Sequence, residues 1–369
     1  MNASLLLLAL LSNWPQWRGP ANDGISPEKK PLPAEWSETK NLAWKLDLPG
    51  EGYSTPCVWG DDIFLSSMDG KKVWCFSGNG TLAAFDFKGE EKWRLDVQKK
   101  YGRFQIAFGM HSTPVLHDGK LYLQLIHDGG GTVAKLDAAT GKEEWKIERV
   151  SDGVAENKHS YASPFLWTDG KSAYLVTHGQ DYAIAYTLDK GEEIWRLAGL
   201  NPEEGYRNDL RFVASPVCTP GLIVVPTAKN KSIVGVKPDA KGRIEAGGKG
   251  EAWRNKTATP DVPSPIVHDG LVYLVGEWGS FTVLDASTGK QVYGKPRGRE
   301  RHRANPMLAD GKVFFASRDS GTVKAVAAGK EYKLLGTNTL PDKFGASPAV
   351  SGGRLYLRGL KSLWAIEAK

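Results

Sequence analysis

The sequence predicts an all-β fold, a β-propeller of four-stranded antiparallel blades, from three observations. A motif of two small residues followed by proline recurs seven times, with successive prolines 41 to 58 residues apart. The shortest spacings match the roughly 40–45 residues of one four-stranded blade. Each copy is followed by the same order of short apolar runs and tight turns, and no long stretch has helical periodicity.

The seven copies of the motif span nearly the whole chain. They are Ser54-Thr55-Pro56, Ser112-Thr113-Pro114, Ala162-Ser163-Pro164, Ala214-Ser215-Pro216, Pro263-Ser264-Pro265, Ala304-Asn305-Pro306 and Ala346-Ser347-Pro348. The proline is expected in the first strand of each blade, strand A. A turn such as Asp118-Gly119 then leads to an alternating apolar strand B, because Asp-Gly accepts the positive φ of a tight hairpin.

Strand C follows, as in Val133–Asp137, and ends in a Thr-Gly-Lys turn such as Thr140–Lys142. Strand D then carries a large aromatic residue, which we expect to pack between neighbouring blades because a flat ring buries a large area there. The predicted docking residues are Trp44, Trp93, Trp145, Trp195 and Trp253, replaced by Tyr293 and Tyr332 in the fifth and sixth copies.

The two ends of the chain are predicted to share one blade. The last copy stops at Ala365–Glu367, after strand C, whereas Leu42–Leu48 precedes the first copy and has the strand D pattern. Pairing these segments would complete the last of seven blades and remove open edges. The first copy has two strand B patterns, Ile63–Leu65 and Val73–Phe76, as if most of a blade had been lost between them.

The predicted organisation is a short signal peptide at 1–12, an N-terminal extension at 13–41 and a single propeller at 42–369. The apolar run Leu5–Leu11 is too short to span a bilayer, so it predicts export to a periplasmic or secreted state and no transmembrane segment. It lacks a preceding Lys or Arg, which a misassigned start codon would explain. The three cysteines, Cys57, Cys75 and Cys218, have no metal-ligand spacing; buried thiols are expected, with a Cys57–Cys75 bridge as the alternative.

The 48 basic and 42 acidic residues give a net charge of +6 and are interspersed along the chain. This pattern argues against a nucleic-acid-binding stripe and leaves an envelope protein, a peptide or a glycan as possible partners. The sequence does not predict an oligomeric state.

The segment Leu136–Lys142 with Trp145 resembles the tryptophan-docking repeat of pyrroloquinoline-quinone (PQQ)-dependent alcohol dehydrogenases. The same repeat occurs in a non-enzymatic outer-membrane assembly propeller. The opening Trp14–Pro20 with Asp23-Gly24 is similar to the start of exported quinone-repeat proteins of planctomycete-like bacteria. The resemblance implies a PQQ-like propeller, and such relatives usually have eight blades.

The candidate ligand site lies on the face formed by the D–A and B–C connections, which include the long segments 98–110, 149–161 and 198–213. Long loops are where binding residues concentrate. The run Arg299–Arg303 could hold a carboxylate, phosphate or sulfate, or be a solvated charge run. The histidines lie in different copies and predict no metal site. The candidate funnel residues are Tyr53, His111, His159, Tyr161, Arg211, Asp261, Trp278, Arg301, His302, Arg303 and Arg318.

Three functions are compatible with these residues, and the sequence favours a non-catalytic binding or assembly scaffold of the cell envelope. The resemblance also implies a PQQ-dependent oxidoreductase acting on alcohols or sugars, with calcium as a further cofactor. The adjacent cysteines of that site and a haem-attachment motif are missing, and Trp278 and Asp261 match its stacking and base residues by position only. A polysaccharide hydrolase or lyase using His111 or His159 with Asp261 is the third alternative.

Overall fold

In the computed structural model, the described residues lie in nine segments of the chain. These are residues 13–48, 51–60, 62–64, 67–69, 72–77, 79–86, 88–202, 204–227 and 232–369, so the predicted signal peptide at 1–12 lies outside them. The chain divides into two compact units. Unit 1 comprises Met1–Lys71, Val262–Leu284 and Gln291–Lys369, and unit 2 comprises Lys72–Asp261 and Asp285–Lys290. The boundary of a single propeller at 42–369 stays a prediction.

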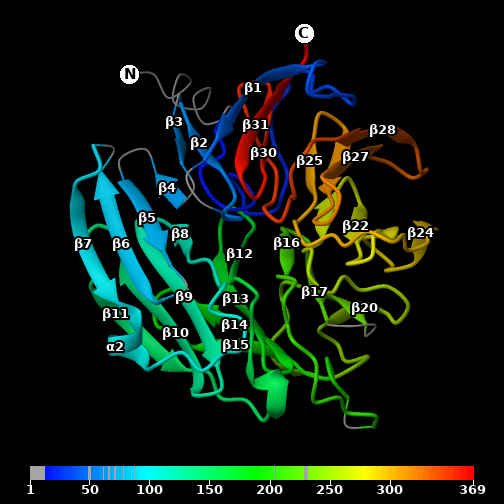
Figure 1. Ribbon diagram of the computed structural model, residues 1–369. Helices are drawn as coiled ribbons and strands as arrows, with labels where there is room; N and C mark the ends of the chain where they lie inside the picture. The colour runs from blue at the N-terminus through cyan, green and yellow to red at the C-terminus, as the bar shows by residue number, and fades with distance from the viewer. Residues whose placement is uncertain are drawn as a thin grey trace. The chain divides into compact units, whose positions relative to one another are not determined.

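Antiparallel sheets make up nearly all of the regular structure (Figure 1). In unit 1, β21 (Ile266–His268), β22 (Leu271–Val275), β23 (Phe281–Asp285) and β24 (Gln291–Lys295) form one sheet, and β25 (Met307–Ala309), β26 (Lys312–Ala316), β27 (Thr322–Ala327) and β28 (Leu334–Thr339) form another. A third contains β1 (Leu42–Asp47), β31 (Ser362–Glu367), β30 (Arg354–Arg358) and β29 (Ala349–Ser351), and β2 (Cys57–Trp59) pairs with β3 (Asp62–Phe64).

Unit 2 contains further sheets of the same kind. They are β8 (Val115–His117), β9 (Lys120–His127), β10 (Gly130–Asp137) and β11 (Glu143–Glu148); β12 (Phe165–Thr168), β13 (Ala173–Gly179), β14 (Tyr182–Thr187), β15 (Glu193–Leu197) and β19 (Gly242–Ile244); and β16 (Val217–Thr219), β17 (Leu222–Pro226), β18 (Ile233–Val236) and β20 (Glu251–Asn255). A further sheet has the order β4 (Ser67–Asp69), β5 (Lys72–Phe76), β6 (Thr81–Asp86), β7 (Glu91–Asp96). The helices are α2 (Val97–Tyr101) and the 3₁₀ turn η1 (Ala155–Lys158).

The repeated proline does not lie inside strand A, as predicted, but immediately before it. The first strands β2, β8, β12, β16, β21, β25 and β29 each begin one residue after the proline. Proline has no N–H for the sheet ladder, so it fits the start of a strand better than its interior. The Asp-Gly turns have the predicted positive φ: Asp118 and Gly119 are at 47° and 69°, and Asp269 and Gly270 at 46° and 72°.

The residue before each proline links successive copies of the repeat. In unit 2, the Thr113 N–H donates to Ser163 Oγ over 2.8 Å, and the Ser163 N–H donates to Ser215 Oγ over 2.9 Å. In unit 1, the Ser264 N–H donates to Asn305 Oδ1 over 2.6 Å, and the Asn305 N–H to Ser347 Oγ over 3.1 Å. We call this arrangement the polar belt. It explains the small polar residue of the motif, because a buried strand-entry N–H needs an acceptor.

The N-terminal strand completes the last sheet, as predicted. β1 pairs antiparallel with β31, with Trp44 opposite Ala365 and Lys45 opposite Trp364. The first copy is divided between two sheets, since β2 and β3 form a separate two-stranded pair and the second strand B pattern belongs to β5. The described residues thus form seven sheets of four or five strands and one of two strands, and the blade number stays a prediction.

The strand D tryptophans contact the C–D turn of the following copy. Trp93 Nε1 donates to Ala138 O over 3.0 Å, and Trp253 Nε1 donates to Ala286 O over 2.7 Å. Trp145 makes the same contact with Leu188 O over 3.2 Å. A Cβ at Gly141 would lie 2.7 Å from the Trp93 ring, so the glycine of the Thr-Gly-Lys turn provides the space for the indole.

Trp195 and Trp44 have other surroundings. Trp195 is fully buried, edge-on to Tyr174, and its strand β15 pairs in parallel with β19. Trp44 is half-buried against Tyr356, with ring centroids 6.1 Å apart. These two tryptophans therefore pack within their own sheets' surroundings rather than repeating the turn contact of Trp93.

A β-bulge recurs where strand D begins. In β7, Trp93 pairs with Ala84 and Glu91 with Phe85, which leaves one extra residue between them; β15 and β20 have the same shift. Side chains three positions apart normally face opposite sides of a strand, and the extra residue places them on the same side. The result is a Glu–Arg ion pair across each bulge, 2.8 Å for Glu193–Arg196 and 2.7 Å for Glu251–Arg254.

The N-terminal extension packs along the sheets of unit 1. Its backbone bonds those sheets at several points: Trp14 bridges Val58, the Leu308 N–H donates to Gly24 O, and the Trp36 N–H donates to Asn338 Oδ1. Cys57 is buried, Cys218 is half-buried, and the Cys75 side chain lies outside the described part of the structure. Within the described residues, the helices are all too short or too polar for a membrane span.

Candidate functional site

Unit 2 brings four of the predicted funnel residues together around an exposed phenylalanine. Phe108, His111, His159, Tyr161 and Arg211, here called the aromatic cluster, come from three successive D–A connections. The Tyr161 ring lies 6.1 Å from the Phe108 ring, 6.0 Å from His111 and 6.2 Å from His159. The Arg211 guanidinium lies 4.9 Å from the Phe108 centroid, within the range of a cation–π interaction.

Phe108 remains 61% exposed although its surroundings hold it in place. Its carbonyl is 2.7 Å from His111 Nε2, and Arg211 is fixed by an ion pair with Glu156, 3.4 Å away. Exposure of a large apolar ring costs free energy in an isolated protein, and rings of this kind anchor protein interfaces. The aromatic cluster therefore presents an anchor residue with little freedom to move.

The polar members of the aromatic cluster are partnered within the chain. His159 Nε2 lies 2.8 Å from Asp128 Oδ1, and His159 Nδ1 lies 3.5 Å from the Tyr161 hydroxyl. Burial raises the pKa of Tyr161, so its phenol stays protonated at neutral pH. The carboxylate beside His159 is Asp128, whereas the predicted partner Asp261 lies half-buried in the segment between β20 and β21.

The two long connections 149–161 and 198–213 are joined by a buried asparagine. Asn157 Nδ2 is within hydrogen-bond distance of Asp181 Oδ1, the Tyr206 hydroxyl and Arg207 O, at 3.0, 3.1 and 2.8 Å. The Leu210 N–H donates to Asn157 Oδ1 over 2.9 Å, and Tyr206 donates to Asp181 Oδ2 over 2.5 Å. This network holds the loops as one rigid body, because each bond crosses between them or to β13–β14.

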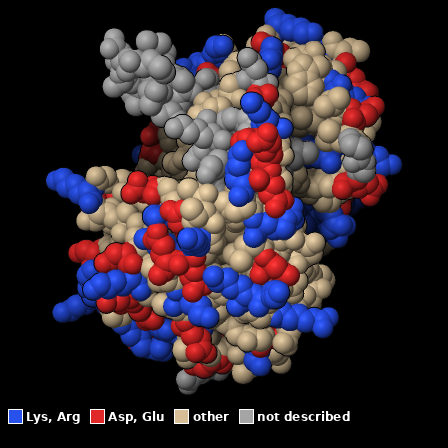
Figure 2. All heavy atoms as spheres, turned by 90° about the vertical axis from the view of Figure 1, so that its left-hand side faces the viewer, with Lys and Arg blue, Asp and Glu red and all other residues tan. Residues whose placement is uncertain are grey.

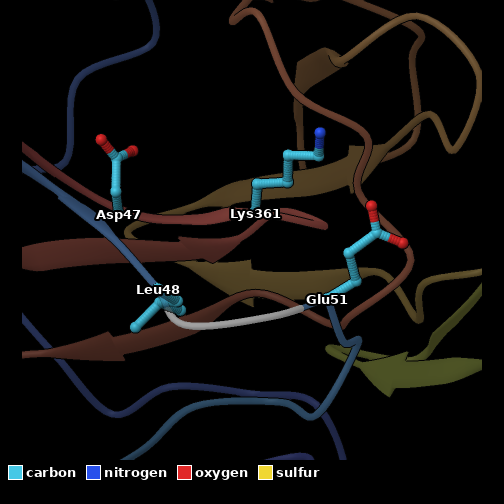
Figure 3. Close-up of a pocket in the computed structure, with 4 residues that line it drawn as sticks. All are labelled: Asp47, Leu48, Glu51 and Lys361. Atoms are coloured by element: carbon cyan, nitrogen blue, oxygen red, sulfur yellow. The ribbon is translucent and has the colours of Figure 1, made fainter.

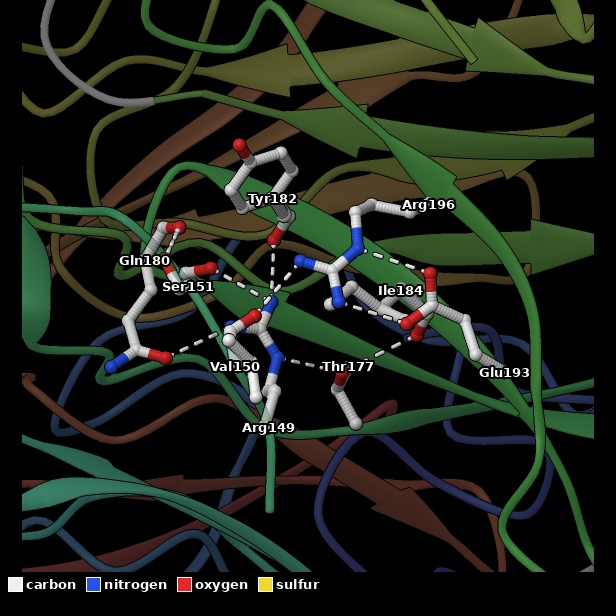
Figure 4. A network of polar contacts seen from close by, with 10 residues as sticks. Arg149, Val150, Ser151, Thr177, Gln180, Tyr182, Ile184, Glu193 and Arg196 are labelled. Atoms are coloured by element: carbon white, nitrogen blue, oxygen red, sulfur yellow. Dashed lines mark hydrogen bonds and ion pairs between the residues drawn. The ribbon is translucent and has the colours of Figure 1, made fainter. Parts of the chain in front are cut away.

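Arg149, at the start of the first of these loops, is fixed from below (Figure 4). Its Nη2 donates to Gly179 O and Tyr182 O, each over 2.8 Å, and its Nη1 donates to Gln180 Oε1 over 3.1 Å. Full burial lowers the pKa of Arg149 to about 10, so it remains cationic at neutral pH. The side chain thus binds the loop to the β13–β14 turn, where left-handed Gln180 and Asp181 leave carbonyls to be satisfied.

These loops expose further apolar side chains beside the aromatic cluster. Val154 is 48% and Tyr206 is 37% exposed, and the Val154 N–H donates to the Tyr206 hydroxyl over 3.4 Å. Together with the aromatic cluster, Val154 and Tyr206 form what we call the loop surface. Apolar and aromatic side chains on rigid loops, with charged groups paired around them, have the composition of a protein-binding surface.

The predicted residues of unit 1 are arranged differently. Arg301 forms a two-pronged pair with Asp319, with Nη2 3.0 Å from Oδ1 and Nε 3.2 Å from Oδ2, and Arg303 Nη2 lies 2.7 Å from Glu277 Oε1. His302 is buried and its Nδ1 contacts Ala316 O, so burial lowers its pKa. The forks expected to hold an anion are therefore engaged by carboxylates of the chain itself.

The remaining candidates of unit 1 lie on nearby connections. Arg318 is half-buried and its N–H donates to Arg301 O over 2.8 Å. Trp278 is 45% exposed on the β22–β23 turn. Tyr53 is exposed and its ring packs on Gly345, where a Cβ would lie 2.6 Å away.

A separate hollow of about 430 Å³ lies at the end of β1 in unit 1 (Figure 3). Its lining residues are Asp47, Leu48, Glu51 and Lys361, and none belongs to the candidate funnel set. Asp47 is already bonded to Lys45 over 2.8 Å and accepts from Ser362 Oγ over 2.9 Å. With few converging polar groups, this hollow does not have the features of a ligand pocket.

Charged residues are mixed on the face shown in Figure 2, where Lys and Arg alternate with Asp and Glu. Lys120, for example, pairs with both Asp137 and Glu144. That face therefore has no continuous area of one sign, in agreement with the interspersed charges of the sequence.

Sequence reasoning missed the residues that organise the site. Phe108, Asp128, Asn157 and Arg149 lie in irregular segments, where spacing gives no indication of which side chains meet. The length of those segments was the one usable signal, since long connections with their own polar hub are typical of functional loops.

Comparison with known proteins relates the chain to propellers of one kind. The family model described as "Outer membrane protein assembly factor BamB" matches residues 78–246 and 243–331. No curated protein sequence matches the chain at a significant level.

Solved structures with the same fold include enzymes and a non-enzymatic protein. BamB from Moraxella catarrhalis aligns with a TM-score of 0.64 at 14% identity, over 88% of this chain and 99% of that chain. Quinohemoprotein alcohol dehydrogenase from Comamonas testosteroni aligns with a TM-score of 0.70 at 13% identity, over 100% of this chain and 83% of that chain. A europium-containing methanol dehydrogenase gives 0.51 at 14% identity, over 96% and 91%. At these identities, the similarity establishes the fold.

The residues present do not fit a PQQ site of the dehydrogenase type. The three cysteines of the sequence are far apart, so there is no pair of adjacent cysteines to contact the quinone. In the part of the chain that the structure describes, no three His, Cys, Asp or Glu side chains are grouped to hold a metal ion. Trp278 and Asp261 also belong to different compact units, each described separately.

Proposed function

Since the chain belongs to the family of PQQ-like repeat propellers described as outer membrane protein assembly factor BamB, we propose that it is a non-catalytic binding scaffold of the cell envelope. The loop surface of unit 2 would hold a protein partner there. The observation that carries this proposal is the exposed Phe108, fixed between Arg211 and Tyr161 on loops that the Asn157 network makes rigid.

A protein partner is favoured because several apolar side chains are presented together. Phe108, Val154 and Tyr206 provide separate points of contact, and the ion pairs of Glu156 and Asp128 surround them with paired charge. An interface core needs contiguous apolar area within a polar rim, and rigid loops lose little entropy on binding. A location outside the cytoplasm agrees with the apolar run Leu5–Leu11 and with the assembly factor named by the family.

Site-specific photo-crosslinking in cells tests this proposal. A photoreactive residue at position 108 is expected to give one discrete adduct, and the same residue at position 334 is the matched control, because Leu334 is 45% exposed in unit 1. The partner is identified from the adduct, purified, and titrated against wild type and Phe108→Ala. Affinity is expected to fall at least about tenfold in the variant, as for an aromatic anchor residue.

Three results would argue against the scaffold. Equal adducts at both positions, or undiminished affinity of Phe108→Ala, would exclude the loop surface as the binding site. Recovery of the protein in the cytoplasmic fraction would exclude the envelope. Dye-linked oxidation of an alcohol or sugar by the purified protein with PQQ and Ca²⁺ would show an oxidoreductase instead.

A further inference from the structure

Unit 1 presents a second exposed aromatic residue in a different setting. Trp278, on the turn between β22 and β23, lies beside the connection 298–303, and we call these two segments with Asp319 the indole platform. The Gly298 N–H donates to Trp278 O and the His302 N–H donates to Glu277 O, each over 2.6 Å. The turn itself is closed by the Gly279 N–H, which donates to Gly276 O over 2.9 Å.

The platform is rigid for reasons that lie in its sequence. Gly279 has a φ of +73°, and a Cβ there would lie 3.0 Å from His302 Nε2, so the turn requires glycine and the buried imidazole supports it. Burial lowers the pKa of His302, so the support is a neutral ring at neutral pH. The indole is thus held at a fixed place while 45% of it stays exposed.

Two arginine–carboxylate pairs lie beside the indole. Arg303 with Glu277 and Arg301 with Asp319 are partly exposed: the arginine side chains are 44% and 37% exposed. A guanidinium has five N–H donors and a carboxylate about four acceptor positions, so each pair retains free donors and acceptors in one plane. Because the charges are matched pair by pair, these groups suit neutral hydroxyls better than an anion.

We propose that the indole platform binds a sugar of an oligosaccharide with flat, glucose-type β-linked rings. The C–H face of such a ring would stack on the Trp278 indole, whose π-face is electron-rich. Its equatorial hydroxyls would exchange hydrogen bonds with the Arg303–Glu277 and Arg301–Asp319 pairs. This ligand goes beyond the proposed protein partner and uses residues separate from the loop surface.

A protein partner fits the indole platform less well than a sugar. In segments 276–280 and 298–303, both fully described, Trp278 is the single exposed large apolar residue. One ring surrounded by hydrogen-bonding groups matches one stacked pyranose, whereas a protein interface requires a larger apolar area. The loop surface of unit 2, with three such residues, provides the contrast.

Calorimetric titration of the full chain with cellohexaose and with chitohexaose tests the proposal. These probes share the ring geometry and differ in the N-acetyl group, so they distinguish neutral glucan from N-acetylated glycan. Trp278→Ala is expected to weaken binding of the better probe at least about tenfold, and Glu277→Gln to weaken it several-fold by removing one acceptor plane. Leu334→Ala is the matched control, being equally exposed in the same unit, and should bind as the wild type does.

The outcomes are decisive in either direction. Absence of binding of both probes up to about 10 mM would overturn the proposal. So would unchanged binding by Trp278→Ala when its thermal unfolding matches the wild type, or a discrete protein adduct from a photoreactive residue at position 278. Phe108→Ala should bind the sugar normally, so failure of the loop-surface proposal leaves this test unaffected.

Discussion

Replacing Ser163 by alanine tests whether the polar belt holds successive copies of the repeat together. Ser163 is buried, and its Oγ accepts the Thr113 N–H over 2.8 Å. Alanine removes the acceptor and leaves that N–H without it in the entry to β8. An unsatisfied buried amide costs about 1–3 kcal/mol, and the lost methylene-sized contact is negligible beside it. We therefore expect the free energy of unfolding to fall by about 2 kcal/mol.

Urea denaturation followed by tryptophan fluorescence measures this loss. Ser163→Thr is the matched variant, because it keeps the hydroxyl acceptor at the same position and should retain most of the stability. The Ser163 N–H still donates to Ser215 Oγ over 2.9 Å in both variants, so Ser215→Ala should add its own independent loss. A Ser163→Ala midpoint equal to that of wild type, or a Ser163→Thr loss as large, would refute the role of the belt.

Three other expectations concern stability and site geometry. Gly141→Ala should lower the thermal midpoint by several degrees in differential scanning calorimetry, because Gly141 has a φ of +70° and a Cβ there would meet the Trp93 ring; Gly170→Ala, with a φ of +87° and open space, separates strain from the clash. Burial raises the pKa of Asp181, so the wild-type protein should lose stability as the pH rises from about 4 toward that pKa, and Asp181→Asn should show a flatter urea-midpoint profile over the same range; parallel profiles would disprove this. Arg211→Ala should weaken partner binding by several-fold while the thermal midpoint stays within about 1 °C, since its pairs are solvent-accessible, and a large midpoint shift would assign it a structural role instead.

The repeating part of the fold was predictable because its signals are local. Alternation, Asp-Gly turns and strand D tryptophans fix strand order, and the pattern of Leu42–Leu48 led to its pairing with the last strand. The polar belt was not predicted, although the small polar residue before each proline is visible in the sequence. Its hydrogen bonds join residues about 50 positions apart, and spacing alone does not indicate which N–H faces which hydroxyl.

The candidate site was predictable in part for the same reason. His111, His159, Tyr161 and Arg211 were selected by their position before the proline, and unit 2 does bring them together. The choice of Asp261 as the partner of His159, and of Arg301 and Arg303 as anion-binding groups, ignored side chains of the intervening loops. Asp128, Asp319 and Glu277 engage them instead, because a long side chain pairs with whichever carboxylate its loop approaches.

The bulged start of the outer strands has a consequence for how copies of this chain behave beside one another. A straight, unoccupied strand edge is a template on which a second molecule can continue the ladder. Here the extra residue bends that edge, and the Glu–Arg pairs of β15 and β20 place charge along it. In β15 a neighbouring segment, β19, already occupies the position that a foreign strand would take. A protein made of many sheets can in this way be concentrated in a confined compartment without growing into fibres.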